Sequence, residues 1–275
     1  MNSINTPVNA ETDLLNAAAL ESAAVIATLS GSSKHDIAIV LGSGWVPAAE
    51  MIGTPVAEFD MTEVPHFSAP GVEGHSGKIR SVDINGKRVL VFLGRTHFYE
   101  GKGVDAVTHL VRTAAAAGCD TMILTNGCGG LNPEWVPGTP VLIKDHINFT
   151  GNSPLHGAHF VDLTDLYSSR LRAMCHEVEP GLPEGVYVQF PGPMFETPAE
   201  ITMVRNMGGT LVGMSTALEA IVARSLGMEI LGISLVTNLA AGMSGEPLNH
   251  EEVLQAGKDA AVRMGDLLAK IIAKI

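Results

Sequence analysis

Short apolar runs alternate with helix-like segments along most of this chain. Four continuous runs rich in branched side chains are typical of buried parallel strands; they are residues 37–41, 88–93, 121–124 and 230–236. Helical periodicity marks residues 11–29, 104–117, 198–207, 217–226 and a C-terminal segment from about residue 251. This alternation predicts an α/β fold, a single three-layer domain with a mixed, mainly parallel central sheet flanked by helices.

No linker, internal repeat or low-complexity tract divides the chain. Its 275 residues, 46% of them hydrophobic, suffice for one large buried core. We therefore expect a single domain over residues 1–275, with residues 1–30 as an N-terminal helical segment. The Gly-, Pro- and His-rich stretch 148–162 predicts a long surface loop, and such loops are often lids or oligomer contacts.

Composition restricts the partners and the compartment. The formal net charge of −12 argues against nucleic acid, whereas a few local donors still hold a small anion. Cys119, Cys128 and Cys175 form no C-x-x-C pair, which indicates a reducing compartment and no structural zinc. The polar N-terminus resembles no secretion signal, and the apolar runs are too short for a bilayer. These features predict a cytoplasmic protein with no membrane contact.

All four predicted strands end in small or polar residues. The ends are Gly42-Ser43-Gly44, Gly94-Arg95, Thr125-Asn126-Gly127 and Thr237-Asn238. Ligands of open α/β folds gather outside the carboxyl ends of the strands. We therefore expect these four ends to converge on one pocket.

The turn at Gly42-Ser43-Gly44 allows two interpretations. A dinucleotide-binding fingerprint needs a third glycine where Pro47 stands, and no Walker lysine follows. The motif is therefore either an ordinary tight turn or a nest of N–H groups that, with the Ser43 hydroxyl, meets one phosphate.

A stronger anion signal follows the second strand. Alternation along an extended segment would place Arg95, His97 and Tyr99 on one side. The fork of arginine donors matches phosphate oxygens, which favours an anion site over a solvated cluster. His75, in a Gly-His-Ser-Gly turn, is equally compatible with a surface role. The glycine run around Gly127 lets the backbone approach a ligand closely.

Other residues suit the recognition of a flat heterocycle. Thr197 and Glu200 form a capping-box pattern, which leaves Glu196 without a structural explanation. Its carboxylate can accept from the N–H edge of a purine, and Phe195 can stack on the ring. The amide of Asn238 can both donate and accept.

Three further positions have ordinary structural explanations. Ser215 is well placed as a helix N-cap, a position compatible with anion binding. His250 begins the C-terminal helix, where capping or surface exposure would be the default. Cys128 has no basic partner in the sequence and is interpreted as a small space-filler.

Taken together, these segments resemble the trimeric family of purine nucleoside phosphorylases that are specific for 6-oxopurines. The matching segments occur in order from Gly42 to about Gly257: GSG, GHSG, GRTHFYEG, TNGCGGLN, DHIN, GPMFET, VGMST, SLVTN and NHEEV. The resemblance implies reversible phosphorolysis of purine (deoxy)ribonucleosides, such as inosine and guanosine, to the free base and (deoxy)ribose 1-phosphate. It also implies a homotrimer in purine salvage.

The resemblance further implies the roles of individual residues. Phosphate would be held by Ser43, His75, Arg95, His97, Ser215 and the backbone N–H of Gly127. The purine and ribose would contact Tyr99, Phe195, Glu196, Val212, Met214, Asn238 and His250, with Phe160 reaching the sugar of a neighbouring subunit. The catalytic candidates are Asn238, Glu196, His97 and His250. Neither a metal nor an organic cofactor is implied, and phosphate is a co-substrate.

Two alternatives remain open at this point. A methylthioadenosine phosphorylase would share the fold and the reaction, but such sites carry an aspartate where Asn238 stands. A non-catalytic nucleotide- or NAD-binding module would use the Gly42-Ser43-Gly44 turn, and Pro47 counts against it. The sequence leaves open the preferred base and the choice between ribose and deoxyribose.

Overall fold

The computed structural model describes residues 10–69, 71, 76–245 and 248–275. Within them, nine strands form one mixed sheet in the order β2-β3-β4-β1-β5-β8-β7-β6-β9. The strands are β1 (Ile37–Val40), β2 (Pro55–Asp60), β3 (Lys78–Ile84), β4 (Lys87–Leu93), β5 (Thr121–Gly130), β6 (Pro140–Asn148), β7 (Glu184–Gln189), β8 (Leu211–Gly213) and β9 (Glu229–Leu239). The helices are α1 (Ala10–Ser30), α2 (Ala49–Ile52), α3 (Gly103–Ala116), α4 (Ser169–Val178), α5 (Pro198–Asn206), α6 (Ala217–Ser225) and α7 (His250–Lys274), with short 3-10 helices η1 (Val46–Ala48), η2 (Met61–Glu63) and η3 (Phe98–Glu100).

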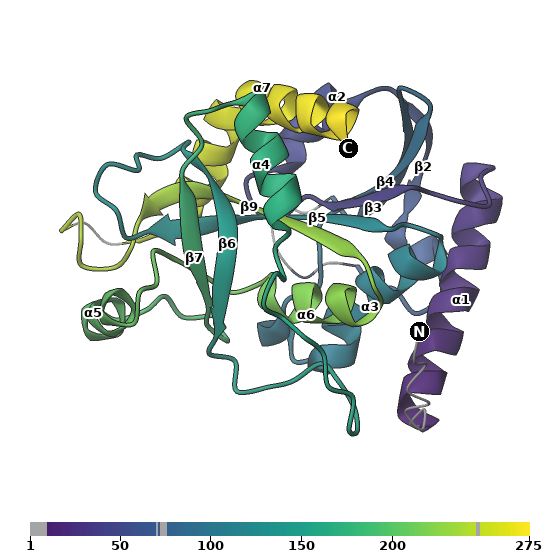
Figure 1. Ribbon diagram of the computed structural model, residues 1–275, viewed down its shortest axis with the longest axis horizontal. Helices are drawn as coiled ribbons and strands as arrows, with labels where there is room; N and C mark the ends of the chain where they lie inside the picture. The colour runs from purple at the N-terminus through teal and green to yellow at the C-terminus, as the bar shows by residue number, and fades with distance from the viewer. Residues whose placement is uncertain (1–9, 70, 72–75, 246–247) are drawn as a thin grey trace.

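Helices cover both faces of the sheet, because its central strands are apolar on both sides. In β1, Ile37 and Ile39 pack into a core that includes residues of α2, α4 and α7. The alternate residues Ala38 and Val40 pack into a second core with residues of α1, α3 and α6. Figure 1 shows α4 and α7 on one side of the strands and α3 and α6 on the other. The predicted three-layer α/β architecture is confirmed.

Part of the sheet closes on itself. Strand β5 pairs with β9 in parallel and with β8 in antiparallel orientation. Strand β6 links β9 to β7, and β7 pairs with β8, so five strands form a closed ring. Closure places Gly129 of β5 opposite both Asn238 of β9 and Val212 of β8. Three predicted site segments thus become immediate neighbours.

Several elements differ in extent from the prediction. Strand β5 continues through the glycine run to Gly130, and β9 continues to Leu239. The extended segment expected after residue 93 leaves the sheet, and residues 98–100 form η3 instead. Strands β2 and β3, at one end of the sheet, escaped prediction because polar residues interrupt their apolar positions.

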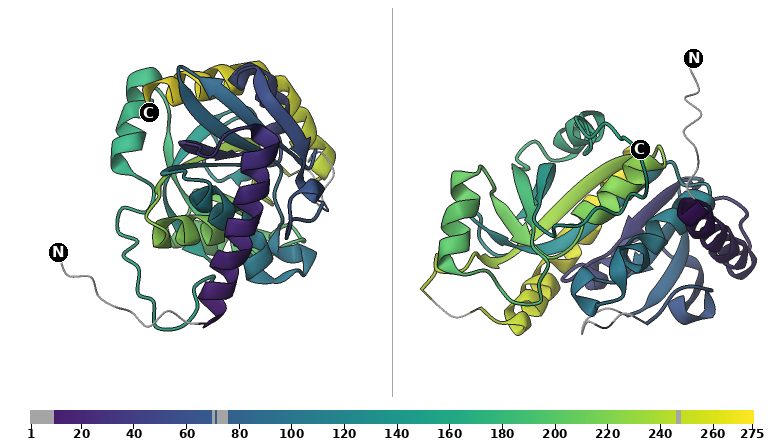
Figure 2. Two further views of the ribbon diagram at one scale, coloured as in Figure 1. Left: turned by 90° about the vertical axis from the view of Figure 1, so that its right-hand side faces the viewer. Right: turned by 90° about the horizontal axis from the view of Figure 1, so that it is seen from below.

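Helix α1 is an exception to the expectation that the apolar segments are too short for a bilayer. By length and composition alone, its 21 residues could also cross a membrane. The helix instead packs beside α3, along one edge of the molecule (Figures 1 and 2). Its Ser22 hydroxyl lies 2.9 Å from Nε2 of buried His109 on α3. An apolar helix that packs on a protein core meets the same length and composition test.

Candidate active site

One cavity of about 390 Å³ opens at the carboxyl ends of the central strands. It brings together eleven of the predicted site residues. These are Ser43, Arg95, His97, Tyr99, Gly127, Phe195, Glu196, Val212, Met214, Ser215 and Asn238. Arg95 and Asn238, which are 143 positions apart in the sequence, therefore face the same space. The expected convergence of the four strand ends is observed.

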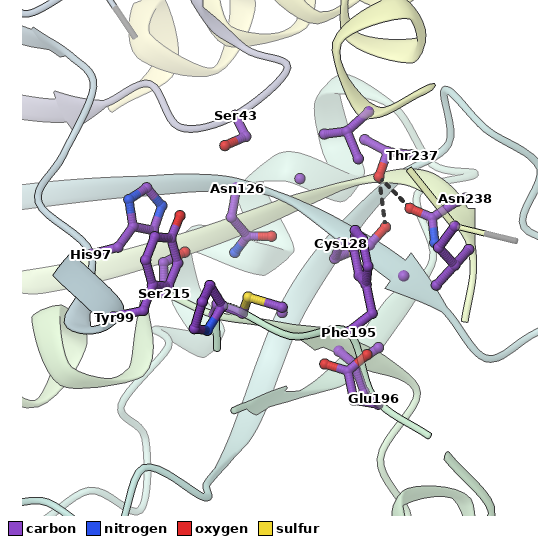
Figure 3. Close-up of a pocket in the computed structure, with 18 of the residues that line it drawn as sticks. Ser43, His97, Tyr99, Asn126, Cys128, Phe195, Glu196, Ser215, Thr237 and Asn238 are labelled. Atoms are coloured by element: carbon purple, nitrogen blue, oxygen red, sulfur yellow. Dashed lines mark hydrogen bonds between the residues drawn. The ribbon is translucent and has the colours of Figure 1, made fainter. Parts of the chain in front are cut away.

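The cavity has two chemically different ends. In Figure 3, Ser43, His97, Tyr99 and Ser215 lie toward one side, and Asn238 lies toward the other. Phe195 and Glu196 enter from the segment before α5. Donor groups suited to an anion are thus separated from an amide and a carboxylate suited to a heterocycle.

The guanidinium of Arg95 is held rigidly at the anion end. Only 1% of Arg95 is exposed. Its Nε donates to Glu219 at 2.9 Å, and its Nη1 donates to the carbonyl oxygen of Thr125 at 2.6 Å. A Cβ at Gly42 would lie 2.3 Å from that Nη1, so only glycine permits this approach. The Gly42-Ser43-Gly44 turn therefore makes room for Arg95 as well as presenting Ser43.

His97 and Tyr99 form the adjoining wall of the anion end. Their rings stack with centroids 4.8 Å apart, because His97 has extended backbone and η3 begins directly after it. Burial lowers the pKa of His97, partly offset by the neighbouring Glu100 carboxylate, whose Oε1 lies 3.6 Å from Nδ1 of His97. His97 is therefore neutral near pH 7 and offers one ring N–H. Burial raises the pKa of Tyr99 to about 12, so its hydroxyl keeps its proton.

Glu100 supports this wall from behind. Its Oε1 accepts from the backbone N–H of His97 at 2.7 Å, and its Oε2 accepts from Lys102 at 2.9 Å. Burial alone would raise the pKa of Glu100, but the hydrogen bonds from His97 and Lys102 outweigh it and lower that pKa to about 2. Glu100 is thus ionised throughout the physiological range.

The interpretation of Ser215 as a helix N-cap, one of two compatible roles, is wrong. The N-cap of α6 is Thr216, which forms a capping box with Glu219 three residues later. The Ser215 hydroxyl lies 3.2 Å from that of Thr216 and lines the cavity. Since capping needs only Thr216, the Ser215 side chain remains at the anion end.

The amide of Asn238 is oriented by its neighbours. Its Oδ1 accepts from the Thr237 hydroxyl at 2.8 Å, and its Nδ2 donates to the carbonyl oxygen of Leu239 at 2.9 Å. The Thr237 hydroxyl also lies 3.2 Å from the carbonyl oxygen of Cys128 (Figure 3). These contacts hold the side chain at the β9 edge of the cavity.

Glu196 is a buried carboxylate beside an exposed ring. It is 8% exposed, whereas Phe195 is 41% exposed. Burial raises the pKa of Glu196, and Glu200 adds a smaller repulsion in the same direction. The predicted capping box of Thr197 and Glu200 is confirmed, so Glu196 takes no part in starting α5. Its carboxylate lines the cavity.

Three predicted site residues are not placed in the cavity. Phe160 is 94% exposed in the segment between β6 and α4 and lies outside the cavity lining. His75 lies outside the described residues. His250 is the first residue of α7, and its side chain also lies outside the described part of the structure. Val253, one turn further along α7, does line the cavity.

Cys128 behaves as the predicted space-filler. It is 3% exposed, and burial raises the pKa of its thiol to about 12. A thiol with that pKa is a poor nucleophile at neutral pH.

Sequence reasoning assigned no role to three residues in or behind the cavity wall. Asn126 and Thr237 line the cavity beside predicted residues, and their positions at strand ends were a usable signal. Glu219 was detectable as the partner of Thr216 in a T-x-x-E pattern. Its pairing with Arg95, 124 positions away, was not detectable without the fold.

The structure disfavours a dinucleotide site at the Gly42-Ser43-Gly44 turn. Strand β1 is followed by the three-residue η1 and the four-residue α2. A Rossmann site instead directs the N-terminus of a crossover helix at a pyrophosphate.

Among the described residues, the one group of side chains close enough to share a metal ion lies outside the cavity. It consists of Glu11, Asp105 and His156. The two ring nitrogens of His156 lie 3.3 Å from Glu11 and 2.8 Å from Asp105. These pairings tie the segment after β6 to α1 and α3.

Comparison with known proteins accounts for this two-ended cavity. Residues 36–273 match the model of the phosphorylase superfamily. The purine nucleoside phosphorylase of a Cellulomonas species is 60% identical over 251 residues, which cover 90% of this chain and 89% of that protein. The enzyme of the same name from Mycobacterium tuberculosis is 54% identical over 256 residues, which cover 93% and 96%.

A solved structure agrees with the sequence comparison. The crystal structure of Schistosoma mansoni purine nucleoside phosphorylase in complex with inosine has a TM-score of 0.84 and 35% identity, and covers 94% of this chain and 96% of that chain. Since both the matched sequence and the matched fold contain the cavity, this chain belongs to the phosphorylase superfamily and, within it, to the purine nucleoside phosphorylases.

Proposed function

We propose that the cavity catalyses the reversible phosphorolysis of purine ribonucleosides and deoxyribonucleosides to the free base and (deoxy)ribose 1-phosphate. One observation carries the proposal: an anion end with Arg95 and a heterocycle end with Asn238 and Glu196 share a single cavity. A nucleoside that bridged them would place its glycosidic bond between phosphate and base. Two relatives named purine nucleoside phosphorylase, 54–60% identical to this chain over most of its length, support the same reaction.

Phosphate is assigned to the donors at the anion end. Arg95 supplies the buried positive charge, and Ser43, His97, Ser215 and the backbone N–H of Gly127 supply neutral donors. His75 is proposed as a further contact. The acidic protein can hold a dianion there because these donors are local and oriented.

Bond cleavage develops positive charge on the sugar and negative charge on the purine. Phosphate beneath the sugar offsets the first charge and then captures the anomeric carbon. Asn238 stabilises the second charge by donating from Nδ2 to the purine at N7 or O6, as preorganised donors do in an oxyanion hole. No metal or organic cofactor takes part in this scheme, and phosphate is the co-substrate.

Base choice is assigned to Glu196 and Asn238. An ionised Glu196 accepts from N1–H of hypoxanthine or guanine, and from the 2-amino group of guanine. Adenine lacks a proton at N1, so a 6-oxopurine fits better. Phe195, Val212 and Met214 supply apolar surface around the base. The same argument disfavours a methylthioadenosine substrate.

The sugar is assigned to Tyr99, Met214 and His250, with His250 orienting the 5′-hydroxyl. We further propose that the enzyme is a cytoplasmic homotrimer in purine salvage and that Phe160 of one subunit closes over the sugar of the next. Phe160 is 94% exposed and therefore accessible to a neighbouring subunit, and aromatic residues are enriched at protein–protein interfaces.

The direct test is release of hypoxanthine from inosine by the purified protein. We expect release that requires inorganic phosphate and produces ribose 1-phosphate in equal amount. Equally fast release without phosphate would indicate a hydrolase, and absence of release would refute the assignment. Methylthioadenosine serves as the competing substrate, and turnover faster than that of inosine would favour the alternative.

A further inference from the structure

A fully buried carboxylate lies directly behind the anion end of the cavity. Glu219 is the third residue of α6, and its exposure is 0%. Its Oε1 accepts from Nε of Arg95 at 2.9 Å, and its Oε2 accepts from the backbone N–H of Thr216 at 2.8 Å. Both oxygens of one carboxylate therefore hold groups next to the cavity, although Glu219 does not itself line it.

The backbone that Glu219 holds is strained. Thr216 has a φ of +83°, a region that β-branched residues rarely adopt. Such a conformation costs of order 1–3 kcal/mol and persists only where the surroundings enforce it. The Oε2 contact of Glu219 supplies one constraint, and Asn126 Nδ2 supplies a second by donating to the Thr216 hydroxyl at 2.9 Å. This constrained turn directly follows Ser215.

Glu219 thus connects, directly and through Arg95, groups that belong to three strands. Arg95 follows β4, and its Nη1 also reaches the Thr125 carbonyl oxygen in β5. Ser215 follows β8 and is joined to the turn by the Thr216 backbone. A shift of the carboxylate would displace the guanidinium and the serine together.

We propose that Glu219 is the positioning residue of the phosphate site, which fixes Arg95 and the turn that presents Ser215. The inference rests on the proposed phosphorolysis, because it assigns phosphate to these two side chains. Glu219 touches neither substrate nor the reacting atoms in this scheme. Its contribution is that both donors are already placed before phosphate arrives, so little ordering accompanies binding.

A purely electrostatic role of Glu219 predicts the opposite change in phosphate affinity when its charge is removed. Glu219 neutralises the charge of Arg95, so removal of the carboxylate charge alone would strengthen the attraction of Arg95 for a phosphate dianion. Positioning predicts weaker phosphate binding on the same substitution. The Michaelis constant for phosphate therefore distinguishes the two roles by direction.

The test compares Glu219→Gln and Glu219→Asp with wild type in the phosphorolysis of inosine. The first variant keeps the shape and removes the charge, and the second keeps the charge but shortens the reach. We expect both to raise KM for phosphate, the Gln variant roughly 10- to 100-fold, the size of one lost hydrogen bond to a charged group. KM for inosine at saturating phosphate should change less than about 3-fold, within the range of an uncoupled site.

Glu63→Gln is the matched control. Glu63 occupies the same capping-box position at η2, with Asp60, and lies outside the cavity. We expect wild-type constants for both substrates. Thermal unfolding verifies that each variant is folded at the assay temperature, and Glu219→Asp keeps a charge opposite Arg95 if the Gln variant does not fold.

Two results would overturn the inference. One is an unchanged or lowered KM for phosphate in a folded variant at Glu219. The other is an equal rise in KM for inosine, which would indicate general damage to the cavity. Wild-type protein without phosphate-dependent release would refute the proposed function itself, whereas active wild type with unaffected variants would refute only the role of Glu219.

Discussion

Gly42 approaches the guanidinium of Arg95 so closely that a Cβ on the glycine would lie 2.3 Å from Nη1. The same Cβ would lie 2.6 Å from the carbonyl oxygen of Thr125. Two strand ends therefore meet at a point where no side chain fits. The anion end of the cavity therefore requires glycine at position 42, which the sequence of the turn alone did not show.

Substitution of Gly42 by alanine should therefore impair phosphate binding. The added methyl group must displace Arg95 or the β5 backbone, and overpacking of this kind costs ~1–3 kcal/mol. We expect KM for phosphate to rise roughly 10- to 100-fold. Steady-state kinetics at saturating inosine measure the change. Gly181→Ala is the control, because a Cβ at Gly181 meets nothing within 4 Å; equal effects of the two substitutions would contradict the explanation.

Asn238→Ala should lower kcat far more than it changes inosine binding. The amide is proposed to stabilise charge that develops on the purine only in the transition state, and loss of such a donor costs ~10²–10³ in kcat. Initial rates of inosine phosphorolysis measure the loss. Asn206→Ala removes an exposed asparagine at the end of α5 and should leave kcat unchanged. If Asn238→Ala lowers kcat by less than about threefold, Asn238 does not stabilise the transition state.

Glu196 should give the pH profile of kcat/KM an acid limb, a range in which activity falls as the pH is lowered. Burial raises the pKa of Glu196 above 4.5, and the ionised carboxylate accepts from N1–H more strongly than the protonated form. Activity should therefore fall as the pH is lowered through this raised pKa. Profiles of kcat/KM for inosine at saturating phosphate measure the limb.

Substitutions at two glutamates identify the origin of that limb. Glu196→Gln should reduce kcat/KM at pH 7 roughly 10- to 100-fold, the effect of a lost hydrogen bond to a charged group, and should remove the part of the limb that Glu196 causes. Glu200→Gln, four positions away, should retain the limb. An identical limb in wild type and Glu196→Gln would assign it to another group.

Phe160→Ala should reduce activity without reducing the stability of the isolated chain. The side chain is 94% exposed, so truncation costs the subunit little packing. If Phe160 covers the sugar in a neighbouring subunit, kcat/KM for inosine should fall roughly 10-fold or more, as for a buried aromatic at an interface. Val136→Ala truncates another exposed apolar side chain and should be neutral. Sedimentation of wild type as a monomer with full activity would disprove the shared site.

Two buried histidines should make stability depend on pH below neutrality. Burial lowers the pKa of His35 and of His109 from 6.5 to about 4. The unfolded chain therefore binds more protons than the folded chain between these values, so the free energy of unfolding is highest above pH 6.5 and falls as the pH drops toward 4. Urea unfolding at about pH 8, 6 and 5, one value above the window and two inside it, measures the fall.

Variants at single histidines isolate the effect. His109→Gln should flatten part of the decline, because the ring beside Ser22 no longer titrates. His159→Gln, at an exposed position, should leave the slope unchanged. A free energy of unfolding that stays constant between about pH 7 and about pH 4.5 would contradict the burial argument.

Local patterns in the sequence determined the strands and helices that build the three layers. Apolar runs such as residues 37–41 predicted buried strands because both faces of a central strand are covered. The capping box at Thr197 was readable because its partners are three residues apart. The ends of these strands also identified Arg95 and Asn238 as members of one pocket, since parallel strands share their carboxyl edge.

Only the tertiary structure decided contacts that no local pattern encodes. The pairing of Glu219 with Arg95 and the closure that places Asn238 opposite Gly129 join residues more than one hundred positions apart. The role of Ser215 also changed, because two adjacent residues were equally suitable caps and the long-range contacts of Thr216 selected between them. Side-chain pattern thus determined which elements form, whereas the packing of distant elements determined which side chains are free to meet a ligand.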